Sequence, residues 1–187
     1  MSQELWTWAH AVAEEELALS LPQRWAHSQG VARRATELAS MVDSDAGLLA
    51  SAAVLHDVGY APRPAVTGFH PLDGASFLRD VHHADDRLVR LVANHSFALL
   101  EAEQRGLMQV LETDFPSLED QVLMDALVWC DMTTTPGGQQ TTAKERVAEI
   151  VCRYGAASVV GHFIGRASPE IFAAVGRVDS RLAAQPR

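Results

Sequence analysis

Apolar residues recur at spacings of three and four along nearly the whole chain, and no stretch alternates apolar and polar residues over the length of a strand. The first pattern places apolar side chains along one side of a helix, whereas alternation is what a half-buried strand needs. We therefore predict an all-α protein built as a bundle of helices.

Local signals indicate where these helices begin and end. Pro22 suits the first position of a helix, and Gly59 with the prolines after it ends another. Thr142 and Glu145 have the spacing of a capping box, in which each side chain bonds the backbone N–H of the other residue. The predicted helices cover residues 3–19, 22–41, 45–55, 71–81, 85–93, 106–116 with a turn, 117–131, 142–154, 156–166 and 169–184.

The length of 187 residues suits a single domain over 1–187. The net charge of −9 disfavours broad nucleic-acid or anionic-membrane binding, because both depend on clustered Lys and Arg. No apolar run reaches the roughly 20 residues of a membrane span, and the first residues lack the basic start and apolar middle of an export signal. We expect a cytoplasmic protein with no membrane partner, and the oligomeric state stays open. Cys130 and Cys152 are expected to be reduced, packed thiols.

Histidine and aspartate residues follow apolar runs in a way that suggests a metal site. His56-Asp57 closes the run 48–55, and Asp131 closes the run 126–130. Neutral imidazoles and carboxylates bind divalent iron, manganese, zinc, nickel, cobalt or magnesium and leave positions free for water and substrate. In chain order the candidate ligands are His27, His56, Asp57, His70, His95 and Asp131.

Four of these residues resemble the motif of the HD superfamily of metal-dependent phosphohydrolases, which has a His, a later His-Asp pair and a final Asp. The matching residues are His27, His56, Asp57 and Asp131. The flanking residues 53–59, Ala-Val-Leu-His-Asp-Val-Gly, look like the central signature of the family. The resemblance covers about 24–131, implies a helical bundle that binds a divalent ion, and leaves C-terminal helices at about 142–184 outside any motif.

His70 and His95 resemble the two additional histidines of six-ligand HD proteins, in which the counterpart of Asp57 bridges two metal ions. That group includes nucleotide-cleaving hydrolases and a few di-iron oxygenases. The interval from His56 to His70 is short compared with several binuclear members, so one ion or two ions both remain open.

The resemblance implies a phosphohydrolase that acts on a small phosphorylated metabolite, with a nucleotide as the first candidate. Its catalytic residues would be Asp57 and His56, which would hold the ion that activates water for attack on phosphorus. An oxygenase and a non-catalytic ligand-sensing module are the alternatives. Candidate substrate-binding cations, taken from the loops and helix ends around the motif, are Arg63, Lys144, Arg146 and Arg24.

Overall fold

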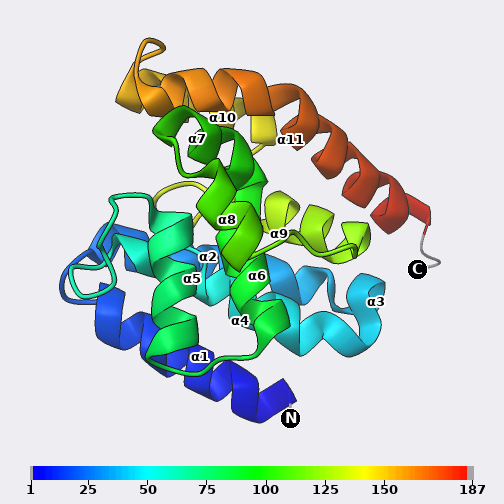
Figure 1. The fold of residues 1–187 in the computed structure, drawn as a ribbon. Coiled ribbons are helices and arrows are strands. Elements are labelled where there is room, and N and C mark those ends of the chain that lie inside the picture. Colours follow the sequence, from blue (N-terminus) through cyan, green and yellow to red (C-terminus); the bar gives the residue numbers. More distant parts are fainter. Residues whose placement is uncertain (1, 185–187) are drawn as a thin grey trace.

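A computed structural model of the chain describes residues 2–184, and within that range it contains helices and no β-strand (Figure 1). The all-α prediction is confirmed. The α-helices are α1 Ser2–Leu17, α2 Pro22–Glu37, α3 Ala39–Val42, α4 Ala46–Leu55, α5 His70–Asp80, α6 Asp86–Asn94, α7 Ala98–Arg105, α8 Met108–Asp114, α9 Gln121–Met132, α10 Ala143–Tyr154 and α11 Val159–Ala184. Three short 3₁₀ helices join them: η1 Asp43–Asp45, η2 Val58–Tyr60 and η3 His95–Phe97.

Helix α4 forms the centre of the core. It carries no charged residue, and α1, α2, α6 and α9 all pack against it. Leu49, Val54 and Leu55 are completely buried in these contacts. Truncation of such a side chain to Ala costs about 2–5 kcal/mol. The central helix is therefore a rigid support for the residues at its C-terminal end, which are His56 and Asp57.

The N-terminal half differs from the predicted boundaries at one point. The helix predicted to reach residue 41 ends at Glu37, and the short helix α3 follows after Leu38. The N–H of Leu38 bonds the carbonyl of Ala35, which is the tighter i→i+3 closure of a helix end. Leu38 is completely buried, so the turn at the end of α2 keeps its apolar side chain in the core.

Helix α7 was not predicted. It begins at Ala98, directly after Phe97, whose backbone is left-handed, and it ends at Arg105, before Gly106, which also has a positive φ of 70°. Gly106 is the usual residue for such an end, because it has no Cβ to clash. Thr142 and Glu145 form the predicted capping box of α10. The helix predicted from residue 117 begins at Gln121, and the side chain of Asp120 caps it by accepting from the N–H of Leu123.

The C-terminal prediction of two separate helices was wrong, because α11 runs through Pro169. Proline removes one backbone hydrogen bond and usually bends a helix, and α11 changes direction along its length (Figure 1). A continuous apolar face holds both halves against α7 and α9. Its buried residues are Phe163, Ile164, Ala167, Ile171, Ala174, Val175 and Val178.

Two further expectations concern the cysteines and the membrane. Cys130 is buried as expected, but Cys152 is exposed, because it lies on the outer side of α10. Within the part of the chain that the structure describes, no single helix is long and apolar enough to cross a bilayer. The segments Pro22–Glu37 and Ala39–Tyr60 have enough length and apolar character only when taken together, and they are bent by 64° relative to each other.

Candidate metal centre

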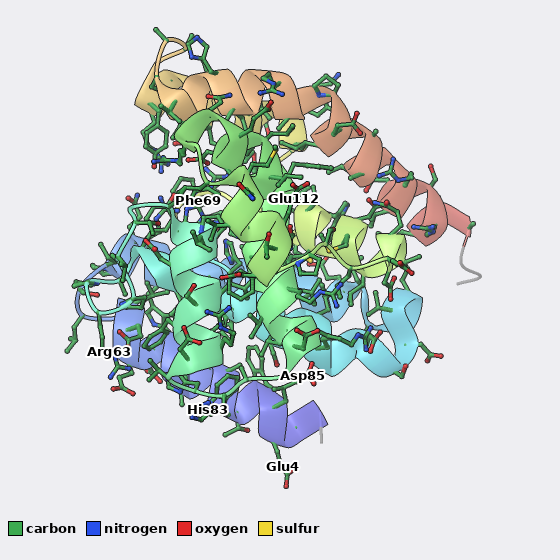
Figure 2. The ribbon with its side chains drawn as sticks, in the orientation of Figure 1. Glu4, Arg63, Phe69, His83, Asp85 and Glu112 are labelled. Atoms are coloured by element: carbon green, nitrogen blue, oxygen red, sulfur yellow. The ribbon has the colours of Figure 1, made fainter. Side chains whose placement is uncertain are left out.

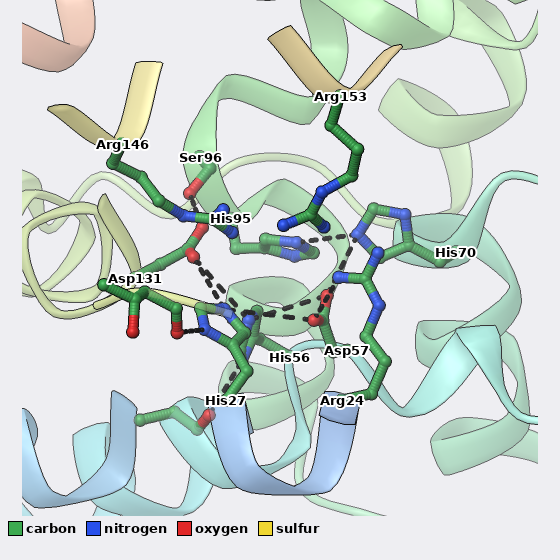
Figure 3. A network of polar contacts seen from close by, with 12 residues as sticks. Arg24, His27, His56, Asp57, His70, His95, Ser96, Asp131, Arg146 and Arg153 are labelled. Atoms are coloured by element: carbon green, nitrogen blue, oxygen red, sulfur yellow. Dashed lines mark hydrogen bonds and ion pairs between the residues drawn. The ribbon is translucent and has the colours of Figure 1, made fainter. Parts of the chain in front are cut away.

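Five segments of the fold bring the predicted histidines and aspartates to one place (Figure 3). His27 comes from α2, the His56-Asp57 pair from the end of α4, and Asp131 from α9. His70 begins α5 and His95 begins η3. The exposed fraction is 2% for His27, 1% for His56, 3% for Asp57 and 7% for Asp131. Such a concentration of buried polar groups is costly to fold unless the groups are paired or bind an ion.

A close backbone contact places His70 beside Asp57. A Cβ atom on Gly59 would lie 2.0 Å from the carbonyl oxygen of His70 and 2.5 Å from the amide nitrogen of Gly74. Only glycine therefore lets η2 lie this close to α5. Because of this approach, His70 Nε2 is 3.4 Å from Asp57 Oδ1.

A second unusual backbone feature places His95 and Asp131. Ser96 and Phe97 both have positive φ, at 50° and 63°, although neither is glycine. This conformation is strained for residues with a side chain and is enriched at functional sites. The Ser96 hydroxyl donates a hydrogen bond of 2.5 Å to Asp131 Oδ2, so the strained turn joins η3 to α9.

Three of the histidines are oriented in the same way. Nδ1 of His27, His56 and His95 donates to a backbone carbonyl: to Thr135 at 3.0 Å, to Ala53 at 2.8 Å and to Val92 at 2.6 Å. A carbonyl only accepts, so Nδ1 carries a proton in each of these rings, and in a neutral ring Nε2 is the nitrogen that could bind a metal ion. This is how ligating histidines are usually fixed in metal sites. His56 Nε2 is buried and has no hydrogen-bond partner, which fits a ligand atom that faces an ion.

The ligand atoms form two overlapping groups. His27, His56 and Asp57 offer atoms that all lie within 4.8 Å of one another, and so do Asp57, His70 and His95. Asp131 Oδ1 lies 3.1 Å from His27 Nε2 and 3.9 Å from His56 Nε2, so it borders the first group. Asp57 belongs to both groups. Mixed nitrogen and oxygen donors of this kind suit a divalent transition metal, and the residues present therefore fit one ion or two.

Comparison with protein families gives the same result as this geometry. The family model described as HD domain matches residues 24–127, which is more than half of the chain. The chain belongs to the HD-domain family. No match was found among curated proteins or among solved structures. HD-domain proteins form a superfamily of metal-dependent hydrolases, and the two ligand groups lie at the place where this HD domain could hold a divalent ion.

The electrostatics of this HD domain keep His56 and His70 neutral and the carboxylates of Asp57 and Asp131 ionised. Burial lowers the pKa of His56 to about 4 and lowers the pKa of His70 well below its usual range. Burial alone would raise the pKa of Asp57, but Arg24 and the surrounding histidines lower it well below its usual range. Burial opposes ionisation of Asp131 too, but the contact with His27 and the nearby His56 and Arg146 lower that pKa well below its usual range. Both forms are the ones that bind metal ions.

Two of the four predicted substrate-binding cations reach the HD cluster. Arg24 Nη1 donates to Asp57 Oδ2 at 2.7 Å, and Arg146 from α10 lines the same cavity (Figure 3). The other two do not. Arg63 pairs with Glu16 of α1 at the outer side of its loop (Figure 2), and Lys144 is exposed and lies outside the residues that line the cavity.

Sequence reasoning missed Arg153, which also points at the cluster from α10 (Figure 3). Arg146 and Arg153 are seven residues apart, so they lie on the same side of a helix. That spacing was visible in the sequence, but nothing local indicated which side of α10 faces the metal ligands. Tyr60 was also missed: its ring stacks on His70 with 3.9 Å between the ring centroids.

Proposed function

We propose that this HD-domain protein is a metal-dependent phosphohydrolase that cleaves a small phosphorylated metabolite, with nucleotides as the first class to test. The observation that carries the proposal is the common orientation of His27, His56 and His95, whose Nδ1–carbonyl bonds direct their Nε2 atoms toward the carboxylate of Asp57. Three arginines beside that cluster, Arg24, Arg146 and Arg153, offer guanidinium donors that suit a phosphate group; Arg24 also pairs with Asp57, and the other two pair with Glu149.

The first ion would be held by His27, His56, Asp57 and Asp131, and a second by Asp57, His70 and His95. When bound, a divalent ion polarises a phosphoryl oxygen and lowers the pKa of a coordinated water toward neutrality.

The side chains of the protein supply the remaining requirements. Asp57 is ionised, so its oxygens accept hydrogen bonds from a water or from a substrate hydroxyl. Arg24 is fixed by Asp57 and by the ring of Tyr60, 3.7 Å from the centroid, and so lies ready to bind a phosphate oxygen. Arg146 is buried with its Nε atom unpaired, and this donor is available to a second oxygen. Fixed donors that need no rearrangement stabilise charge in the transition state most effectively.

The test is a metal analysis together with an assay of phosphate release from a panel of nucleoside monophosphates and sugar phosphates. The protein is purified without chelators, and wild type is compared with Asp57→Ala and with the matched histidine pair His95→Ala and His162→Ala. His162 is exposed and belongs to neither ligand group, so its replacement serves as the control. We expect metal and activity to be lost in Asp57→Ala and retained in His162→Ala. Absence of phosphate release by the metal-loaded wild type from every compound would refute the proposal.

The second ligand group also supports a di-iron oxygenase as an alternative, since Asp57, His70 and His95 could complete a binuclear centre. The alternative requires iron in the purified protein and consumption of O₂ with an organic substrate. Two equivalents of iron per chain, with one lost in His95→Ala and no phosphate release, would favour it over hydrolysis. A non-catalytic sensing module is disfavoured, because all candidate ligands are present and oriented.

A further inference from the structure

The cavity that contains the metal ligands also has apolar lining residues. They are Ile150 of α10 and Val160, Phe163 and Ile164 of α11. We call these four residues the α10–α11 wall. All four lie beyond residue 127, where the match to the family model ends, so the wall is a feature of this chain and not of the matched region.

Charged and apolar groups lie next to each other in this cavity. Ile150 is four residues after Arg146 and three before Arg153, so these three residues share one side of α10, and the wall residues of α11 add aliphatic and aromatic carbon. Arg146 is 6% exposed, and its Nε atom is buried without a hydrogen-bond partner. A buried donor left unpaired is costly and therefore points to a missing acceptor. A ligand with an anionic end and an apolar end would satisfy both kinds of group at once.

The enclosed part of the cavity is small. Its volume is about 80 Å³, whereas a cavity of about 150 Å³ binds one benzene molecule. The cavity is partly open to solvent, so it can enclose a phosphate group while the organic part of a ligand extends along the α10–α11 wall.

We infer that the α10–α11 wall selects phosphate monoesters whose organic part presents one apolar or aromatic group, such as a single nucleobase or a benzyl group. This inference rests on the proposed phosphohydrolase function, and it adds the substrate class. Arg146 and Arg153 orient the phosphate, and the wall binds the organic part by burial of apolar surface.

Two pairs of substrates test the wall without changing the chemistry of the leaving group. Thymidine 5′-monophosphate is compared with 2-deoxyribose 5-phosphate, and benzyl phosphate with glycerol 3-phosphate; each pair releases similar primary alcohols. We expect kcat/KM to favour the member with the apolar group by about 10-fold or more in at least one pair. No preference in either pair would overturn the inference.

A matched pair of valine substitutions distinguishes the effect of changing the wall from the effect of any substitution at the start of α11. Val160 lines the cavity, whereas the neighbouring Val159 is 41% exposed and does not. Valine to threonine keeps the shape and replaces one methyl group with a hydroxyl. We expect Val160→Thr to lower the preference about 10-fold and Val159→Thr to leave it unchanged. Equal effects, or no effect of either substitution, would refute a role for the wall.

Binding of non-hydrolysable phosphonates distinguishes failure of the inference from failure of the proposed function. Calorimetry compares benzylphosphonate with methylphosphonate on the metal-loaded protein. Tighter binding of benzylphosphonate, reduced by Val160→Thr, would support the wall even if no ester were cleaved. Cleavage of esters without any apolar preference, together with equal binding of the two phosphonates, would leave the hydrolase function intact and overturn the substrate class.

Discussion

Arg24 lies directly against Asp57, with Nη1 of the guanidinium 2.7 Å from Oδ2 of the carboxylate. The guanidinium also lies over the ring of Tyr60, which stacks on His70. Arg24 therefore contacts Asp57, the ligand common to both groups, and also the aromatic ring that packs on His70 of the second group. Burial alone would lower the pKa of Arg24, but Asp57 outweighs it and raises that pKa, so the cation is permanent. The pair therefore combines a fixed positive charge for substrate with a carboxylate held in its ionised form.

The first prediction concerns this pair. Arg24→Met should lower kcat/KM by about 10- to 100-fold, because a charge-assisted hydrogen bond contributes about 1.5–3 kcal/mol. Arg24→Lys keeps the charge but loses the flat contact with Tyr60, so it should restore only part of the activity. Steady-state kinetics on a cleaved phosphate ester measure both variants. Full activity of Arg24→Met would show that this arginine contacts neither substrate nor transition state.

The second prediction concerns the hydrogen bond from Ser96 to Asp131. Ser96→Ala should weaken metal affinity by about 10- to 100-fold, because removal of a group that orients a ligand has effects of that size. Ser96→Gly loses the same hydrogen bond, so its metal affinity should fall to the same degree. Glycine adopts the positive φ of 50° without strain, so the free energy of unfolding of Ser96→Gly should be higher than that of Ser96→Ala. Competition with a chelator and thermal unfolding separate the two effects. Wild-type metal affinity in both variants would argue against the positioning role of Ser96.

The third prediction concerns the close approach at Gly59. Gly59→Ala should lower the free energy of unfolding by more than about 2 kcal/mol, because its Cβ would meet backbone atoms of α5 that cannot move independently. The control is Gly176→Ala in α11, where nothing lies within 4 Å of the added atom. That change should stabilise the protein by about 0.5–1 kcal/mol, the usual difference between glycine and alanine inside a helix. Denaturant titration of both variants gives the comparison, and similar stabilities would contradict the packing described for η2 and α5.

The fourth prediction concerns the two cysteines. Burial raises the pKa of the Cys130 thiol well above its usual range, so this group should remain a protonated, shielded thiol in the folded protein. Cys152 is exposed and should react. A thiol-specific reagent at pH 8 should therefore label one group per folded chain and two after denaturation. Cys152→Ser should abolish rapid labelling, and rapid reaction of two thiols in the native protein would contradict the burial of Cys130.

Much of this molecule follows from local patterns. Helical periodicity fixes the fold class, because the burial of one helix side depends only on spacing along the chain. His56-Asp57 and Asp131 could be recognised as site residues, since each closes an apolar run and matches a motif in order. The capping box of α10 was equally local, because its hydrogen bonds join residues only three positions apart.

The tertiary structure decided the features that depend on contacts between distant segments. Arg63 follows the metal motif closely in sequence, but Glu16 of α1 binds it at the surface. Arg153 is distant in sequence, and the packing of α10 brings it to the ligand cluster. Pro169 predicted a break that the continuous apolar face of α11 overrides. In each case the energy of packing between helices exceeds the local preference, and only the folded chain shows which segments meet.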